Sequence, residues 1–250
     1  MILEIDYGNT RLKWRLLESN TSICIARGAV KELHELIPSL QKSGCTNLDF
    51  CRVCSVRSSD DEACLVSLIS GAYGVAVYYA QSARSLSGVT NGYIDASKLG
   101  VDRWLALVAA YVRSQRACIV IDCGTAITVD YVRADGVHLG GCIAPGFGQM
   151  ASMLKNSTQL QVELSSTENP EPACLAADTQ TAVYLGIRAM ALGFIKEQLL
   201  CAQAELGASF VVVCAGGDSH FVCDIAAEAV IDEDLVFAGL ALACPYNMQG

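Results

Sequence analysis

The chain has 250 residues, of which 52% are hydrophobic and 17% charged, which excludes a disordered chain and allows one large core or two ordinary ones. The net charge of −9 disfavours general affinity for nucleic acid or an anionic membrane. Asp6 and Arg11 interrupt the first apolar segment, so we expect no signal peptide, no membrane span and a cytoplasmic protein.

The chain opens with a predicted strand, Ile2 to Ile5, which ends in the polar run Asp6-Tyr7-Gly8-Asn9-Thr10. A second strand, Arg11 to Leu17, follows at once, with Lys13 and Arg15 on its polar face. These two strands predict a hairpin with a carboxylate, a glycine and polar side chains at its tip.

The next segments alternate between strand and helix patterns. We expect strands at Ile23–Ala29, Asn47–Val56 and Val75–Tyr79, and helices at Lys31–Ser43 and Ser59–Ser70. Three strands followed by alternating helices and strands predict a mixed sheet covered by helices.

The 13 cysteines are scattered, many of them inside apolar runs, which is typical of reduced, buried thiols in a cytosolic protein. Cys51 and Cys54 form a lone C-x-x-C motif, whereas zinc sites usually have a second pair or nearby histidines. The three histidines are not paired in the sequence, so we expect no zinc site.

A polar loop from Gly88 leads to a predicted helix that begins near Leu99. Asp102 and Arg103 fall in its first turn, where the helix dipole stabilises an anion. An ordinary first-turn acid beside a solvated arginine is the alternative interpretation.

The stretch Ile119 to Asp130 reads IVIDCGTAITVD, which predicts a strand, a tight turn and a second strand. Gly124 lets the backbone approach a ligand, and the hydroxyls of Thr125 and Thr128 can donate to phosphate oxygens. Because Asp122 repels phosphate unless a cation lies between them, the turn indicates phosphate together with a metal. A plain hairpin with an Asx turn is the alternative.

The strand–Asp-x-Gly–strand pattern thus occurs twice, at Asp6 and at Asp122, which is a weak internal repeat. Two such hairpins facing each other across a cleft would hold a nucleoside triphosphate and its metal.

Further elements follow in order. We expect a strand at Val137–Ile143, a loop at Ala144–Gly148, a helix from Gln149, an exposed loop at Ser157–Ala173, a long helix at Thr179–Leu206 that breaks near Gly193, a strand at Phe210–Cys214, a helix at Phe221–Ala229, an extended link at Ile231–Asp234 and a closing helix at Leu235–Ala243.

Two smaller features of this half also bear on a site. Thr179 and Thr181 fit the cap and first turn of the long helix. Gly216 and Gly217 follow a predicted strand, where they either let an adenine or ribose lie flat on the backbone or form a plain turn.

Taken together, these motifs resemble type III pantothenate kinase, a family of the acetate and sugar kinase, Hsp70 and actin superfamily. The matching motifs are Asp6-x-Gly8-Asn9-Thr10-x-x-Lys13, Gly100-Val101-Asp102-Arg103, Asp122-x-Gly124-Thr125-Ala126-x-Thr128-x-Asp130, Gly140-Gly141-x-Ile143-x-Pro145-Gly146, Thr181 and Ala215-Gly216-Gly217-Asp218.

The resemblance implies an α/β fold of two ribonuclease H-like, actin-like ATPase domains, with mixed sheets flanked by helices and a cleft between them. We place these domains at residues 1–113 and 114–250. It also implies ATP-dependent phosphorylation of pantothenate to 4′-phosphopantothenate, the first step of coenzyme A synthesis, by a homodimer whose pantothenate site is completed across the interface.

The resemblance also assigns residues to roles. Asp102 is the general base, Asp6 helps to hold Mg²⁺, and Asp122 binds a monovalent cation, K⁺ or NH₄⁺. ATP is bound by Asp6, Gly8, Asn9, Thr10, Lys13, Thr125, Gly216 and Gly217, and pantothenate by Tyr93, Gly100, Val101, Asp102, Arg103 and Thr181.

Three alternatives remain at this point. A related kinase of the superfamily would act on a sugar or a short acid. A transcription accessory factor would work through a partner, because the acidic charge and the lack of a helix-turn-helix signature disfavour direct DNA binding. An ATPase that switches a partner would need more subdomains than 250 residues provide.

Overall fold

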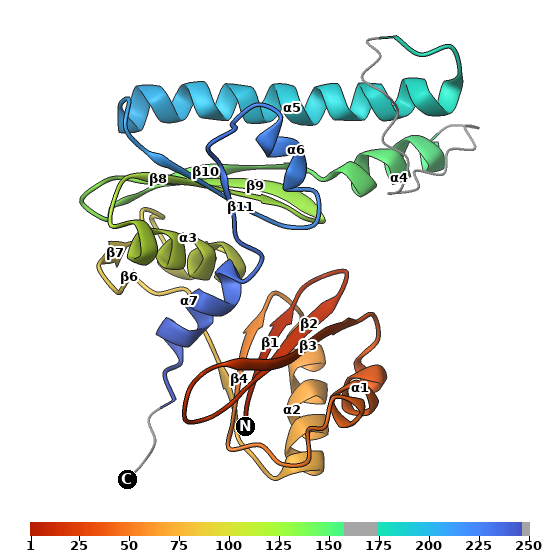
Figure 1. Cartoon of the computed structure of the whole chain (residues 1–250), viewed down its shortest axis with the longest axis vertical. Coiled ribbons are helices and arrows are strands. Elements are labelled where there is room, and N and C mark those ends of the chain that lie inside the picture. Colours follow the sequence, from red (N-terminus) through yellow and green to blue (C-terminus); the bar gives the residue numbers. More distant parts are fainter. Residues whose placement is uncertain (158–174, 247–250) are drawn as a thin grey trace. The chain divides into compact units, whose positions relative to one another are not determined.

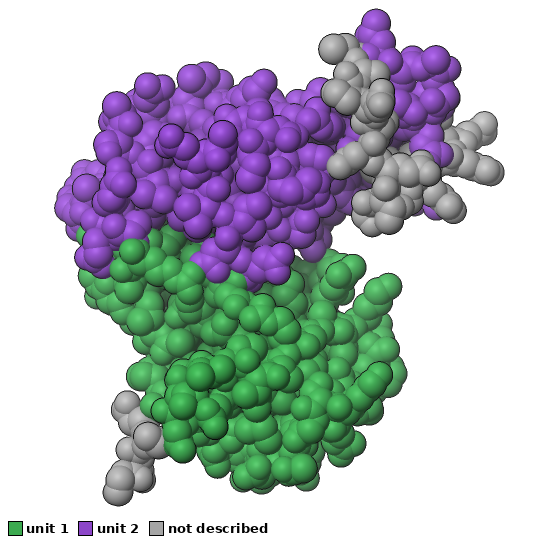
Figure 2. All heavy atoms as spheres, viewed as in Figure 1, with its two compact units in different colours: residues 1–113, 136–138, 234–250 green, residues 114–135, 139–233 purple. Residues whose placement is uncertain are grey.

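The computed structural model describes residues 1–157 and 175–246, so the predicted loop Ser157–Ala173 lies, from residue 158 on, outside the described part. The chain divides into two compact units (Figure 2). The first comprises Met1–Arg113, Gly136–His138 and Asp234–Gly250, and the second Ser114–Asp135 and Leu139–Glu233. Among the described residues, no helix combines the length and apolar character that a membrane crossing requires.

The first unit is built on a mixed sheet with the strand order β3-β2-β1-β4-β5 (Figure 1). β1 pairs antiparallel with β2 and parallel with β4. The strands are β1 (Ile2–Tyr7), β2 (Leu12–Leu17), β3 (Cys24–Val30), β4 (Phe50–Ser55) and β5 (Val77–Tyr79), with a separate small hairpin of β6 (Ser85–Leu86) and β7 (Val89–Thr90). The helices are η1 (Leu33–Glu35), α1 (Leu36–Lys42), α2 (Ser59–Tyr73), η2 (Ala96–Lys98), α3 (Val101–Ser114) and α7 (Leu235–Ala243).

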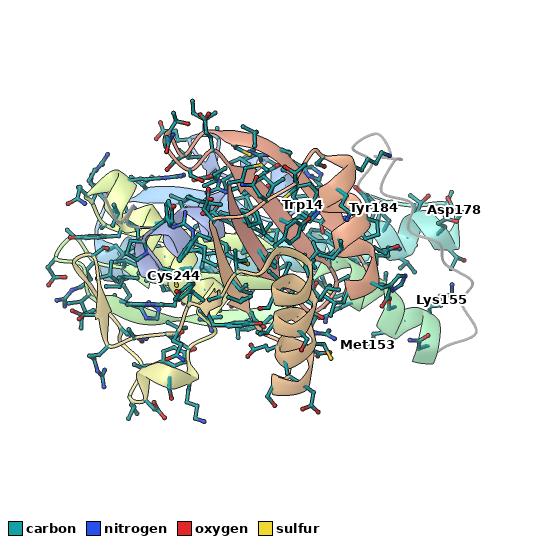
Figure 3. All side chains as sticks on the ribbon, turned by 90° about the horizontal axis from the view of Figure 1, so that it is seen from below. Trp14, Met153, Lys155, Asp178, Tyr184 and Cys244 are labelled. Carbon is teal, nitrogen blue, oxygen red and sulfur yellow. The ribbon has the colours of Figure 1, made fainter. Side chains whose placement is uncertain are left out.

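One face of this sheet is apolar and packs against α1 and α2. Alternate residues of β1, among them Leu3 and Ile5, meet Leu36, Leu65 and other helix residues in one buried core. Trp14 (Figure 3) lies opposite Gly28 in the neighbouring strand, where a Cβ would come within 2.6 Å of the indole ring. The amphipathic pattern of the sequence therefore fixes which face the helices cover.

The other face carries charge and is covered by α7. Glu4 is fully buried there and forms ion pairs with Arg15 and Arg52, whose Nε donates to a Glu4 oxygen at 2.8 Å. Arg52 also donates to the carbonyl of Cys244 (Figure 3), which follows α7, at 2.8 Å. At the other end of the helix, Arg15 pairs with Asp234 at 3.2 Å.

These charges suit the dipole of α7, because the anion Asp234 lies at its N-terminus and the cation Arg52 at its C-terminus. The last helix of the chain therefore belongs to the first unit.

The second unit repeats the same architecture. Its sheet has the order β10-β9-β8-β11-β12, and β8 pairs antiparallel with β9 and parallel with β11. The strands are β8 (Cys118–Cys123), β9 (Ala126–Val132), β10 (His138–Pro145), β11 (Val211–Ala215) and β12 (Val230–Ile231), and the helices α4 (Phe147–Ser157), α5 (Thr179–Leu206) and α6 (His220–Cys223). α5 runs along this sheet (Figure 1), and its buried residues join the core of β8 and β9.

The two sheets confirm the internal repeat that the sequence indicates. Asp6 is the fifth residue of β1, and Asp122 is the fifth residue of β8. Asp6 lies opposite Lys13 in β2, and Asp122 lies opposite Thr128 in β9. Equivalent strands of two similar sheets thus end in an aspartate and a turn.

Three expected elements differ in the structure. α5 is continuous through Gly193, whose surroundings are open, and a single exposed glycine weakens a helix by only about 1 kcal/mol. The expected helix at Phe221–Ala229 is only four residues long, because the backbone N–H groups from Asp224 to Ala229 form a few bonds to carbonyls three or four residues earlier and not a continuous i−4 ladder. The expected helix at Lys31–Ser43 starts as the short 3₁₀ turn η1.

The cap of α5 is also not the expected one. Asp178 (Figure 3) is the N-cap and accepts a hydrogen bond from the Thr181 backbone N–H, whereas Thr179 is the first helical residue. An aspartate is a stronger cap than a threonine, and its charge suits the helix dipole.

Replacing Glu4 by Gln should destabilise the protein by about 3 kcal/mol, because two largely buried arginines lose their counter-charge while the side-chain shape is kept. Urea unfolding measures this. Arg133→Gln, in the exposed Arg133–Asp135 pair, is the control and should leave the midpoint unchanged. Equal midpoints for the two variants would contradict the prediction.

Candidate active site

The first acidic turn joins β1 to β2. Its backbone closes through the Gly8 N–H, which donates to the Arg11 carbonyl at 3.1 Å, and Arg57 donates to the Asn9 carbonyl at 3.2 Å. Asp6 is half-buried at the strand end, whereas Asn9, Thr10 and Lys13 are exposed. The turn is therefore held by one backbone bond of its own and by the Arg57 side chain, while Asn9, Thr10 and Lys13 face solvent.

Asp102 lies in the first turn of α3. Its Oδ1 accepts a hydrogen bond from the Arg103 backbone N–H at 2.8 Å, and the carboxylate lies so close to Gly100 that a Cβ there would come within 2.7 Å of Oδ1. Arg103 itself is only 8% exposed. The arginine is therefore not solvated, as the alternative interpretation supposed, while the role of Asp102 stays a prediction.

Cys54 connects the two acidic positions of this unit. It lies opposite Asp6 in β4 and is fully buried, and burial is the first cause that raises the pKa of its thiol. The charges of Asp6 and Asp102 raise that pKa further, so both carboxylates lie near one neutral thiol. Cys51, three residues earlier, points into the apolar core on the opposite face, so the C-x-x-C pair cannot share a ligand.

Tyr93 and Arg103, both predicted to bind substrate, are in direct contact. Arg103 Nη1 donates to the Tyr93 hydroxyl at 3.0 Å. The first unit thus brings together Tyr93 and the Gly100–Arg103 turn. A guanidinium whose position is fixed by a phenol is suited to bind a carboxylate.

The second acidic turn is enclosed by glycine backbone in the second unit. A Cβ on Gly216, which has φ +87°, would lie 2.4 Å from the Cys123 carbonyl oxygen and 2.5 Å from Asp122 Oδ1. A Cβ on Gly146 would lie 2.4 Å from the carbonyl oxygens of Gly124 and Thr125. The Asp122 carboxylate therefore lies in a close-packed cradle that side chains would fill.

The next residues after Gly216 complete this cradle. The Asp218 N–H donates to the Cys123 carbonyl at 3.1 Å, and burial raises the pKa of the Asp218 carboxyl. Gly217, in contrast, has no atom within 4 Å of an added Cβ. The remaining predicted residue, Thr181, lies half-buried in the first turn of α5.

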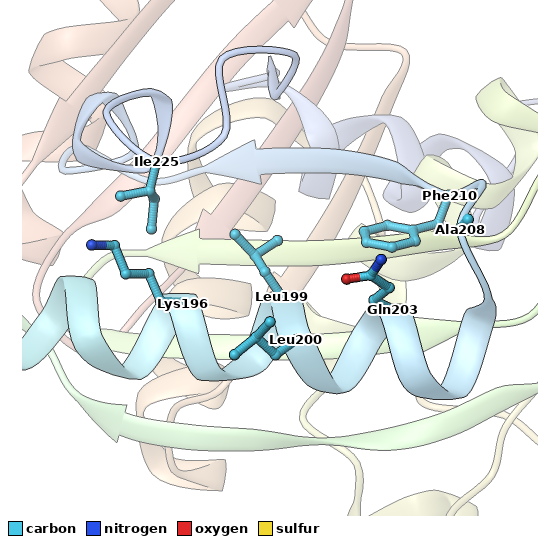
Figure 4. Close-up of a pocket in the computed structure, with 7 residues that line it drawn as sticks. All are labelled: Lys196, Leu199, Leu200, Gln203, Ala208, Phe210 and Ile225. Carbon is cyan, nitrogen blue, oxygen red and sulfur yellow. The ribbon is translucent and has the colours of Figure 1, made fainter.

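A hollow of about 480 Å³ lies elsewhere in the second unit, between α5 and the segments that flank β11 and α6 (Figure 4). None of the residues that we predict for the site lines it. Its lining residues are Lys196, Leu199, Leu200, Gln203, Ala208, Phe210 and Ile225.

Some residues around the predicted site were not expected from the sequence. Cys54, Asn91 and His138 were not among the predicted site residues, although all three are almost fully buried. The one available signal was the position of Asn91 two residues before Tyr93, because a short polar side chain often bonds to a nearby backbone N–H.

Two sheets of the same strand order, each with an aspartate and a turn at the end of its first strand, define the fold class, which is that of the sugar kinases and actin-like ATPases. A protein from Sinorhizobium meliloti, described as a 2-dehydro-3-deoxygalactonokinase, shares this fold, with a TM-score of 0.58, 12% identity and coverage of 97% of this chain and 98% of that one. A protein from Campylobacter jejuni, described as a Baf family transcriptional activator, also has a TM-score of 0.58, at 20% identity, covering 95% and 94% of the two chains.

The profile of the family described as type III pantothenate kinase matches residues 2–200. A type III pantothenate kinase of Pseudomonas fluorescens (strain Pf0-1) is 40% identical over 249 residues, 99% of this chain and 100% of the relative. One of Ectopseudomonas mendocina (strain ymp) is 42% identical over 252 residues, with the same coverage. The chain belongs to the type III pantothenate kinase family.

Gly216→Ala should destabilise the protein by roughly 2 kcal/mol or more, because the positive φ strains an alanine and its Cβ meets backbone atoms. Gly217→Ala is the matched control and should stay within about 0.5 kcal/mol of the original, since its surroundings are open. Denaturant unfolding of both variants measures the difference. If Gly216→Ala unfolds at the same midpoint as Gly217→Ala, the close packing around Asp122 is not important for stability.

Proposed function

We propose that the protein transfers the γ-phosphoryl group of ATP to the primary hydroxyl of pantothenate, which gives 4′-phosphopantothenate, the first step of coenzyme A synthesis. The observation that carries this proposal is the 40% identity to a type III pantothenate kinase over the full length of that relative. Every motif residue of the resemblance is present in the chain. Phosphoryl transfer depends on positioning and charge neutralisation, which is what these turns offer.

The residues of the first acidic turn fit a nucleotide phosphate and a divalent cation. The ATP phosphates would be bound by Gly8, Asn9, Thr10 and Lys13. Asp6 would help to hold Mg²⁺. Within residues 1–157 and 175–246, no group of three or more metal-ligating side chains could hold an ion. A single carboxylate together with phosphates and waters is the usual way in which proteins hold Mg²⁺. When bound, the metal neutralises charge on the phosphates.

In the second acidic turn, ATP would be bound by Thr125, Gly216 and Gly217. Asp122 would bind a monovalent cation, K⁺ or NH₄⁺. The support is the cradle around Asp122, where backbone carbonyls crowd a carboxylate. Oxygen donors of this kind are suited to hard cations.

Asp102 is the residue we propose as general base. The acceptor hydroxyl loses its proton late in such a transfer, so a carboxylate within about 3 Å of that hydroxyl is sufficient. Gly100 and Val101 shape this turn, and Arg103, fixed by Tyr93, would bind the carboxylate of pantothenate. Thr181 is assigned to pantothenate by the family resemblance alone.

Transfer of radiolabelled phosphate from ATP to a panel of acceptors tests the function. The panel contains pantothenate, sugars and short hydroxy acids. Pantothenate should be the preferred acceptor by kcat/KM. A preference for a sugar or another acid would make the protein a different kinase of the superfamily. No transfer at all would favour the role as a transcription accessory factor, since the Campylobacter jejuni protein of the same fold is described as a transcriptional activator.

Asp102→Asn should lower kcat at least about 100-fold, because the amide cannot accept the hydroxyl proton, while ATP binds with unchanged affinity. Steady-state kinetics and calorimetric titration with ATP measure the two quantities. A variant with near-normal kcat would show that Asp102 is not the base.

Activity should depend on K⁺ or NH₄⁺, because Asp122 needs a cation between its charge and the phosphates. Rates are compared in KCl, NH₄Cl and NaCl at equal ionic strength. Full activity in the Na⁺-only buffer would remove the role that we assign to Asp122.

We also propose a cytoplasmic homodimer whose pantothenate site is completed across the interface. Exposed apolar side chains on α5 support an interface there, since Met190 is 67% and Leu200 61% exposed. Sedimentation equilibrium measures the oligomeric state, and a monomer at assay concentration would contradict this part of the proposal.

A further inference from the structure

The loop that carries Tyr93 is held by polar contacts and not by apolar burial. Ile94, its neighbour, is 100% exposed, so the hydrophobic effect does not fix this segment. Arg84 instead donates to three backbone carbonyls of the loop, those of Asn91 at 3.2 Å, Tyr93 at 3.0 Å and Ile94 at 3.0 Å. Hydrogen bonds from Arg84, and not packing in the core, therefore hold the backbone of this loop.

Asn91 is the centre of this loop. It is 1% exposed, and its Oδ1 accepts a hydrogen bond from the Tyr93 backbone N–H at 3.0 Å. Its Nδ2 donates to the carbonyls of Ala83 at 3.2 Å and Ala96 at 3.3 Å, on either side of the loop. One buried amide therefore joins both ends of the loop to the residue that contacts Arg103.

His138 holds the same loop from a distant part of the sequence. The segment 136–138 lies beside the loop, since Thr90 bridges to Val137 and its N–H donates to the Gly136 carbonyl at 2.9 Å. His138 is 1% exposed, and its Nδ1 accepts from the Gly92 N–H at 3.4 Å. Its ring stacks on that of Tyr93, with the centroids 6.0 Å apart and 16° between the planes.

Tyr93 passes these constraints on to Arg103. Its hydroxyl accepts from Arg103 Nη1 at 3.0 Å, so the position of the phenol helps to set the position of the guanidinium. Bidentate binding of a carboxylate requires both the direction and the place of that fork. A loop free to move would lose this alignment even with Tyr93 and Arg103 intact.

We propose that Asn91 and His138 are positioning residues that hold Tyr93, and through it Arg103, in the geometry that binds the carboxylate of the acceptor substrate. The inference rests on the proposed function, because that function supplies an acceptor with a carboxylate. It assigns to two buried residues a role in acceptor affinity and none in ATP binding.

The experiment compares Asn91→Ala and His138→Phe with two controls, Asn47→Ala and His34→Phe, in which the same side chains are exposed. His138→Asn is the conservative variant, because its Oδ1 can take the place of Nδ1 as acceptor from Gly92. Steady-state kinetics gives KM for pantothenate, KM for ATP and kcat. Hydrogen exchange of the peptide around residues 84–98 reports loop order without any ligand.

Asn91→Ala and His138→Phe should each raise KM for pantothenate about fivefold or more, with KM for ATP and kcat within about twofold, and should speed exchange in the loop. His138→Asn should restore much of the affinity, and the two controls should match the original protein. Because both residues act through one loop, the double variant should lose less than the product of the single effects.

Other outcomes overturn the inference. Unchanged exchange in the loop shows that the two residues do not hold it, whichever substrate the enzyme uses. Faster exchange with unchanged KM for pantothenate shows that loop order does not set affinity, and equal rises in both KM values show general damage. A wild-type protein that transfers no phosphate to pantothenate rejects the proposed function instead, which the kinetics of that protein alone reveals.

Discussion

The buried carboxylate of Glu4 is the interaction on which the first unit depends. Charged groups out of water are costly unless each is paired, and Glu4 is paired twice, with arginines of β2 and β4. α7 is almost entirely apolar, so it has no charge of its own with which to reach the sheet. Arg52 and Arg15 supply that connection, one at each end of the helix. The polar face of the sheet thereby becomes a specific docking surface for the last helix.

The same face of that sheet also carries Asp6, the residue that we propose as a ligand of Mg²⁺. Side chains alternate along β1, so Glu4 and Asp6 point to the same side, with Arg52 and Cys54 beside them in β4. The structural ion pairs and the candidate metal ligand thus share one row of the sheet. The second unit repeats the strand order without this arrangement at its first strand, since β8 is apolar until Asp122.

Much of the fold followed from the sequence because strand and helix periods are local properties. The alternation in Arg11–Leu17 and the two Asp-x-Gly turns predicted both hairpins correctly. What the sequence could not supply were contacts between distant segments: Glu4 with Arg52, or His138 beside Tyr93. Such pairs have no periodic signal. The shortness of α6 was missed for a related reason, since tertiary context can override the helix pattern of the sequence.

The position of α7 in the sequence has a consequence for biosynthesis. The first sheet is complete in its strands by Tyr79, yet the helix that covers its charged face starts at Leu235. During translation, the Glu4 side of the sheet therefore has no helix to cover it until residues 235–243 have been synthesised. The segments of the first unit are therefore complete in the chain only after all those of the second unit, residues 114–135 and 139–233.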